Sequence, residues 1–150
     1  MKLKSNAFQQ NGDIPSKYTC EGEDINPPLS ISDVSAETKS LVLIMDDPDS
    51  PGAPWLHWTL FNIDPKTTEI PENGIPEGAM EGTTSFAQTG YGGPCPKMGP
   101  KVHRYYFKLY ALDKSLDIRF GATRADIENA MERHIIAQAE LMGIYSLQKK

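Results

Sequence analysis

The apolar positions of this chain fall into short runs that are separated by polar, turn-rich segments. Residues 41–45 are continuously apolar, which is typical of a strand buried on both faces. Residues 57–63 and 102–112 are rich in aromatic and β-branched side chains, as a packed strand surface prefers. Leu29 and Ile31 alternate with serines, which indicates another half-buried strand. The pattern predicts a mainly β protein.

Helical spacing occurs in one later segment, residues 124–142. Thr123 is a suitable N-cap with Asp126 as its capping partner, and Gly143 follows the expected end. The apolar stripe would consist of Ile127, Ala130, Met131, Ile135 and Met142. His134 would be a packed histidine within this helix. One helix after many strands favours a β-sandwich of antiparallel sheets with a C-terminal α-helix.

The remaining segments are rich in turn-forming residues. Residues 1–29 should form short strands and turns, because Asn11-Gly12, Pro15 and Pro27-Pro28 interrupt them. Residues 64–100, rich in glycine and proline, predict a long ordered excursion over the surface, either functional or containing short strands. A length of 150 residues predicts a single domain, 1–150.

Charge and composition exclude several classes of partner. The net charge is -5, and no run of basic residues precedes Lys149 and Lys150, so nucleic acid is not expected to bind. The polar N-terminus lacks the apolar region of a secretion signal, and no run of eighteen apolar residues occurs. We therefore expect a cytoplasmic protein without integral membrane association. That compartment favours reduced thiols at Cys20 and Cys95, with a disulfide or a reactive thiol as alternatives.

The candidate chemistry lies where the apolar strands begin and end. Asp46 or Asp49 alone would be ordinary polar turn residues. Asp47 shares strand parity with Leu41, Leu43 and Met45, so it should project from the same face as they do. If the strands are neighbours, Asp47 and His57 meet at one rim of the sheet. His103 and Tyr105 share a face of their own strand.

Together these side chains suggest an anion pocket. Two imidazoles and a tyrosine can donate hydrogen bonds to phosphate or carboxylate, while Asp47 orients an imidazole. Trp55, which stands among prolines, could wall such a pocket, and residues 90–96 could offer backbone amides.

Two enzymatic interpretations use the same residues. Two histidines and a carboxylate are a common metal-ligand set, although no His-x-x-x-His motif supports it. Cys95 or a serine could act as a nucleophile with His57 or His103, but no Gly-x-Ser-x-Gly motif is present.

Several of these segments resemble the signature motifs of the phosphatidylethanolamine-binding proteins, in their short prokaryotic, kinase-inhibitor-like branch. The similar segments are Tyr18-Thr19-Cys20-Glu21-Gly22, Asn26-Pro27-Pro28-Leu29, Asp47-Pro48-Asp49-Ser50-Pro51, Trp55-Leu56-His57-Trp58, Gly93-Pro94-Cys95-Pro96 and His103-Arg104-Tyr105. They occur in the family's order and span nearly the whole chain. The branch usually reads Pro-Cys-Pro-Pro, so Lys97 is a departure that puts a positive charge near the expected pocket.

The resemblance implies a Greek-key arrangement of two antiparallel sheets with a helix near the C-terminus and a small anion cavity at one end. Carried over by motif, the cavity residues would be Asp47, Trp55, His57, Gly93, His103 and Tyr105. It further implies a non-enzymatic protein without cofactors that binds phosphate-bearing headgroups or phosphorylated ligands and, in some members, protein kinases or other partners. The alternative is a metal-assisted or acid-base hydrolase of a small phosphorylated or acyl compound. A symmetric homodimer is compatible with the sequence.

Overall fold

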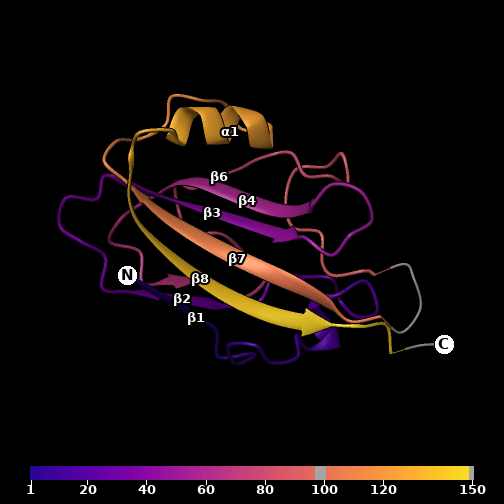
Figure 1. The fold of residues 1–150 in the computed structure, drawn as a ribbon. Coiled ribbons are helices and arrows are strands. Elements are labelled where there is room, and N and C mark those ends of the chain that lie inside the picture. Colours follow the sequence, from indigo (N-terminus) through magenta and orange to yellow (C-terminus); the bar gives the residue numbers. More distant parts are fainter. Residues whose placement is uncertain (97–100, 149–150) are drawn as a thin grey trace.

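The computed structural model describes residues 1–96 and 101–148, which fold into two antiparallel sheets and one α-helix (Figure 1). The helical elements are the 3-10 turn η1 (Ser16–Tyr18) and helix α1 (Arg124–Met131). The strands are β1 (Lys2–Lys4), β2 (Leu29–Ser32), β3 (Ser40–Asp47), β4 (Trp55–Ile63), β5 (Glu69–Ile70), β6 (Met80–Glu81), β7 (His103–Leu112) and β8 (Ile135–Tyr145).

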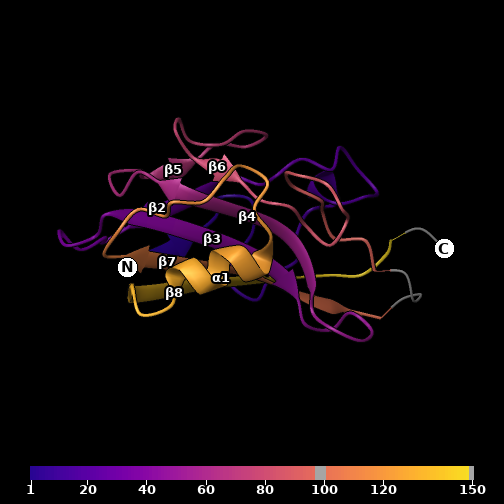
Figure 2. The same ribbon diagram turned by 90° about the horizontal axis from the view of Figure 1, so that it is seen from above.

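The molecule is layered around its larger sheet. This sheet has the strand order β6-β4-β3-β7-β8, and the smaller sheet has the order β1-β2-β5. Helix α1 covers one face of the larger sheet, and β1 and β2 lie against the other (Figures 1 and 2). The predicted mainly β class with one helix near the C-terminus is therefore confirmed.

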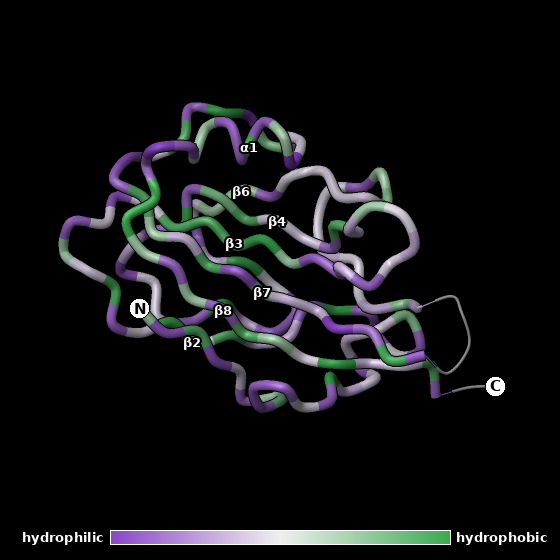
Figure 3. Tube along the Cα trace, in the orientation of Figure 1, coloured by the Kyte–Doolittle hydropathy of each residue, from purple (hydrophilic) through white to green (hydrophobic). Residues whose placement is uncertain are grey.

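Strand β3 is the centre of both packed layers. All eight of its residues are buried, and its alternation directs Leu41, Leu43 and Met45 into the core shared with the smaller sheet. Val42 and Ile44 pack on the opposite face, against residues of α1. The apolar colour of β3 runs through the middle of the fold (Figure 3). The expectation of a strand buried on both faces is confirmed.

The strand neighbours are those that the site requires. Strand β3 pairs antiparallel with β4 on one side and with β7 on the other. The C-terminal end of β3 consequently lies beside the N-terminal ends of β4 and β7, at the end of the sheet toward which the β3 arrow points in Figure 1.

The predicted long helix is wrong over its second half. Thr123 and Asp126 do form a capping box, but α1 ends at Met131 and Arg133 adopts a left-handed φ of 69°. The chain then reverses into β8, which pairs with β7 from His103↔Tyr145 to Leu112↔Ile135. Gly143 lies within this strand, where a Cβ would come 2.5 Å from Cγ1 of Ile14. This glycine allows close packing and does not end a helix.

His134 is correspondingly not a helix residue. It lies in the turn before β8, where its Nδ1 is 2.8 Å from the Asp113 carboxylate and its side chain is 37% exposed.

The glycine- and proline-rich excursion contains two short strands, β5 and β6, one in each sheet. Lys97, the departure from the family pattern, falls outside the described residues. No helix in the part of the chain that the structure describes is long and apolar enough to cross a bilayer.

Candidate functional site

A cavity of about 310 Å³ lies where the end of β3 meets the starts of β4 and β7. Strand pairing places Asp47 opposite Trp55, and alternation turns His57, His103 and Tyr105 to the same side. The lining residues are Asp47, Ser50, Pro51, Trp55, His57, Phe86, Cys95, Pro96, His103 and Tyr105. Five of the six residues expected at the site are therefore brought together.

Asp47 holds His103 in one orientation. The Nδ1 atom of His103 is 2.6 Å from Oδ2 of Asp47, and both residues are only 3% exposed. The other oxygen of Asp47 accepts the backbone N–H of Asp49 at 2.8 Å. Because Nδ1 donates to the carboxylate, the imidazole offers Nε2 to the cavity that it lines. The predicted orienting role of Asp47 agrees with this geometry.

His57 is fixed by backbone instead of by a carboxylate. Its Nδ1 is 2.6 Å from the Gly92 carbonyl oxygen, and its own carbonyl accepts the Gly92 N–H at 3.0 Å. Burial lowers the pKa of His57 below its usual 6.5, although the Gly92 carbonyl and the Asp47 charge oppose that shift. The ring is therefore neutral at pH 7 and carries its proton on Nδ1. Its Nε2 can then take up a proton.

Tyr105 contributes a buried hydroxyl next to the Asp47 carboxylate. Its side chain is 0% exposed, and its oxygen makes no hydrogen bond of normal geometry to a described residue, although Asp47 lies close enough to act on it as an acceptor. Burial raises the pKa of Tyr105, and the Asp47 charge raises it further. The ring packs edge-on against His57 and stacks with His103, with centroid distances of 5.2 Å and 6.3 Å. An unpaired buried hydroxyl costs about 1–3 kcal/mol, so a ligand oxygen at this position would be stabilised.

Aromatic and proline side chains form the rest of the wall. Trp55 and Phe86 contact each other edge-on at 5.5 Å, and Phe86 also packs edge-on against His57 at 5.3 Å. No sequence pattern indicated Phe86, which is an isolated aromatic residue in a glycine-rich segment. Ser50, Pro51 and Pro96, by contrast, belong to the motifs that resemble the family.

Gly93 is placed behind the wall and does not line the cavity. Its N–H donates to the Asp24 carboxylate at 2.8 Å, and a Cβ would lie 2.2 Å from the Tyr18 carbonyl oxygen. This residue allows two segments to approach closely, and its amide is already used.

The expectation of reduced cysteines is wrong. Cys20 and Cys95 form a disulfide with an S–S distance of 2.09 Å. The bond ties the segment that contains Cys95 to the segment after η1, and Cys95 lines the cavity. Spacing along the chain gave no indication of this pairing, because the fold alone brings the two segments together.

Asp46 and Asp49, which lie near Asp47 in the chain, form ion pairs with basic side chains. Asp46 faces away from the cavity, and its Oδ2 contacts Arg124 at 2.8 Å and Lys108 at 3.3 Å. Asp49 binds the Arg104 guanidinium through both oxygens, at 2.9 Å and 2.8 Å. The Arg104 hydrogen bonds lower the pKa of Asp49 to about 2. Each aspartate therefore fixes one side of the β3 end.

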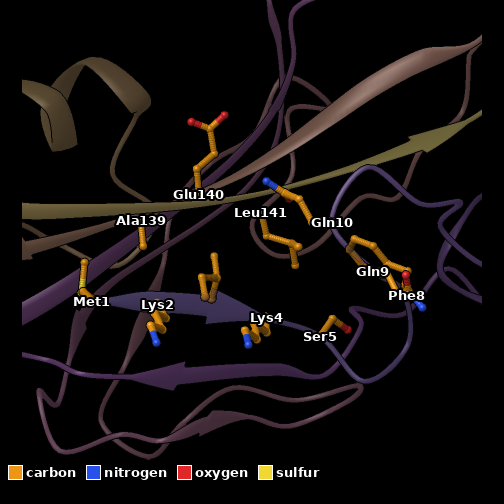
Figure 4. Close-up of a pocket in the computed structure, with 11 residues that line it drawn as sticks. Met1, Lys2, Lys4, Ser5, Phe8, Gln9, Gln10, Ala139, Glu140 and Leu141 are labelled. Carbon is orange, nitrogen blue, oxygen red and sulfur yellow. The ribbon is translucent and has the colours of Figure 1, made fainter.

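Two further features bear on the alternatives: the metal-ligand residues and a second hollow. No group of three or more metal-ligating side chains occurs among residues 1–96 and 101–148. A hollow of about 480 Å³ between β1 and β8 is larger, but Lys2, Leu3, Lys4, Glu140 and Leu141 surround it without any histidine (Figure 4).

The fold and the site together define a class: a mainly β protein with a histidine-lined cavity at the end of its central sheet. The sequence model of the family described as phosphatidylethanolamine-binding protein matches residues 4–146. The chain belongs to the phosphatidylethanolamine-binding protein family.

Relatives and solved structures agree with this assignment. The chain is 49% identical to a UPF0098 protein of Methanothermobacter thermautotrophicus, covering 97% of this chain and 98% of that one. It is similar to the crystal structure of the phosphatidylethanolamine-binding protein homologue CT736 from Chlamydia trachomatis, with 43% identity, a TM-score of 0.92 and coverage of 98% and 97%. Escherichia coli YbcL has 30% identity, a TM-score of 0.91 and 98% coverage of both chains. The UPF0098 name states no activity.

Proposed function

We propose that the protein is a non-enzymatic binding protein that takes a phosphate or carboxylate group into the cavity between His57 and His103. The observation that carries this proposal is the set of fixed polar atoms there. Each imidazole uses Nδ1 in a hydrogen bond to the protein, and the buried Tyr105 hydroxyl makes no hydrogen bond of normal geometry to a described residue. Two Nε2 atoms and one hydroxyl, all on residues that line the cavity, are thus available to one bound group.

The anion would belong to a phospholipid headgroup or to another phosphorylated ligand. The description of the matching family model names phosphatidylethanolamine, which supports the headgroup. A kinase or another signalling partner that carries the phosphorylated group would be regulated by this binding. The disulfide weighs against a reducing compartment, since such bonds persist mainly under oxidising conditions or in hyperthermophiles. Cell fractionation tests the localisation.

The binding test is a titration with inorganic phosphate followed by NMR of the histidine ring nitrogens. We expect the signals of His57 and His103 to move with one saturable affinity. Asp47→Asn and His57→Gln should abolish the response while the dispersed spectrum of the folded protein is retained. His134→Gln is the matched control, because that exposed ring lies on Asp113 and outside the cavity. Ring signals that do not respond to phosphate or to acetate would refute the proposal.

The alternative, an acid-base hydrolase, has one observation in its favour. A buried carboxylate that orients a histidine is also how general acids and bases are held. Turnover of small phosphate esters or acyl esters that is lost in His103→Gln would establish it. Stoichiometric metal in protein purified without added metal would establish its metal-assisted form.

A further inference from the structure

The cavity lining combines a polar part and an apolar part. Asp47, His57, His103 and Tyr105 supply the polar part, and the apolar part comes from Pro51, Trp55, Phe86 and Pro96. A volume of 310 Å³ corresponds to roughly ten molecules of liquid water, at about 30 Å³ each. A phosphate or acetate ion held by the polar part would leave much of this volume free. The cavity therefore has room for an apolar group attached to the anion.

The apolar part is packed against its neighbours. Phe86 contacts both Trp55 and His57 edge-on. A Cβ at position 92 would lie 2.5 Å from the Phe86 ring, so the glycine found there leaves the space that the ring occupies. Both rings remain partly exposed beside the cavity. Two rigid, partly exposed aromatic faces suit a flat apolar group, preferably another aromatic ring.

The charge of the lining limits the charge of the ligand. No lysine or arginine lines the cavity among the residues that the structure describes. Arg104 follows His103 in the chain, but the Asp49 carboxylate already binds its guanidinium at two points. Asp47 adds a negative charge beneath His103. Sites for dianionic phosphate usually supply arginine or lysine, and the described lining has neither, so its charge favours a ligand with a single charge. Lys97 follows Pro96 outside the described residues, and the comparison of monoester with diester tests whether its charge reverses this preference.

We propose that the pocket selects monoanions that carry an aromatic group, either carboxylates or phosphodiesters, and that Trp55 and Phe86 determine this specificity. The inference rests on the proposed anion site and adds what its occupant must carry besides the anion. The anionic group lies at His57, His103 and Tyr105, and the aromatic group lies against Trp55 and Phe86.

The test compares matched ligands at pH 7.5 by the same histidine ring NMR signals. The affinity for phenylacetate relative to that for acetate measures the contribution of the aromatic group. The affinity for methyl phenyl phosphate relative to that for phenyl phosphate measures the effect of ligand charge. A phosphomonoester has a second pKa of about 6 and is therefore mainly dianionic at pH 7.5, whereas the diester is a monoanion. We expect phenylacetate to bind at least about tenfold more tightly than acetate, since it buries a whole ring. The diester should bind more tightly than the monoester.

Substitutions test which residues produce the preference for the aromatic ligand. Phe86→Ala should reduce the ratio of phenylacetate to acetate affinity to about threefold or less. Phe120→Ala is the matched control, because Phe120 is 65% exposed and lies outside the cavity, so the ratio should not change. If Phe86→Ala does not fold, Trp55→Leu is used in its place. The ligand comparisons on the unaltered protein test the specificity without either variant.

Opposite outcomes separate the two proposals. Equal affinities for phenylacetate and acetate, or tighter binding of phenyl phosphate than of its methyl ester, would overturn the specificity and leave the anion site in place. If no anion moves either histidine signal, the anion site itself is refuted.

Discussion

His57 and His103 are the same chemical group in two different environments. His103 donates to a carboxylate, whereas His57 donates to a backbone carbonyl. The difference follows from the neighbours of each strand end. Asp47 ends β3 beside His103 at the start of β7, whereas Gly92 lies beside His57 on β4. Each ring is thereby held with Nε2 as its remaining polar atom. The roles that we propose for them in binding an anion follow from these partners and not from the residue type alone.

The first prediction concerns pH. A bound anion favours the imidazolium form of His57, so the pKa of His57 should be higher in the complex than in the free protein, where burial lowers it below 6.5. Affinity should then be greatest below the free pKa and fall as pH rises from that value to the pKa of the complex. Calorimetric titration with phenylacetate, whose carboxylate stays ionised from pH 5.5 to 8, should show this fall.

Proton uptake is the check on the mechanism. At pH 7, calorimetry in two buffers of different ionisation enthalpy should show a net uptake of protons on binding. Affinity that is constant over this pH range, or proton release, would contradict the role assigned to Nε2 of His57.

The second prediction separates stability from binding at Tyr105. Tyr105→Phe removes a buried hydroxyl that makes no hydrogen bond of normal geometry, its nearest acceptor being Asp47, so the free energy of unfolding should stay equal or rise by up to about 1 kcal/mol. Phosphate affinity should fall, because the ligand loses a donor. Urea denaturation and the NMR titration measure the two effects. A variant that is destabilised by more than about 1 kcal/mol would show that the hydroxyl has a structural partner.

Among the secondary-structure elements, α1 and β8 show which features local sequence patterns can predict and which they cannot. The capping box at Thr123 was predictable, because both of its partners lie within four residues. The end at Met131 was not, since residues 135–142 also fit a helical stripe. Pairing with the ten-residue strand β7 decides the matter, and that partner lies far away in the sequence. Tertiary pairing overrides local propensity here.

The third prediction concerns the contact of α1 with the central sheet. Asp46 is buried under α1, and Arg124 and Lys108 hold one of its oxygens while the other has no described partner. Arg124→Ala should lower the free energy of unfolding by about 1–3 kcal/mol, less than for a fully buried pair because Arg124 is partly exposed. The exposed Arg119, for which no ion pair with a described residue is found, is the control. Arg119→Ala should change stability by no more than about 0.5 kcal/mol. Equal effects of the two substitutions in urea denaturation would show that Asp46 does not depend on Arg124.

Over the whole molecule, the site residues that lie at strand ends could be predicted from the sequence, and those on long loops could not. Parity and strand position placed Asp47, His57, His103 and Tyr105, and the surrounding prolines indicated Trp55. The motifs resembling the family pointed to the same residues and to Gly93, which does not line the cavity. Phe86 could not be predicted, because its place depends on the path of a long loop and on the space above Gly92. The disulfide was missed for the same physical reason. Cys20 and Cys95 are 75 residues apart and meet only once the loops are laid over the sheet.

The last prediction tests what this disulfide does. A cross-link over 75 residues restricts the unfolded chain, so the double variant Cys20→Ser/Cys95→Ser should lose about 2–4 kcal/mol of unfolding free energy. In the folded state three other contacts hold the same wall. They are the hydrogen bonds from Cys20 N–H to Pro94 O, from Tyr91 hydroxyl to Tyr18 O, and from Gly93 N–H to Asp24.

Because those contacts remain, the folded variant should keep the phosphate response of both histidine rings. Guanidinium denaturation measures the stability, and the ring titration in the absence of denaturant measures the pocket. Dithiothreitol should lower the midpoint for the unaltered protein and leave that of the double variant unchanged. A folded variant that no longer binds phosphate would mean that the cross-link shapes the cavity wall directly, and that reduction of the disulfide in the cell would release the ligand.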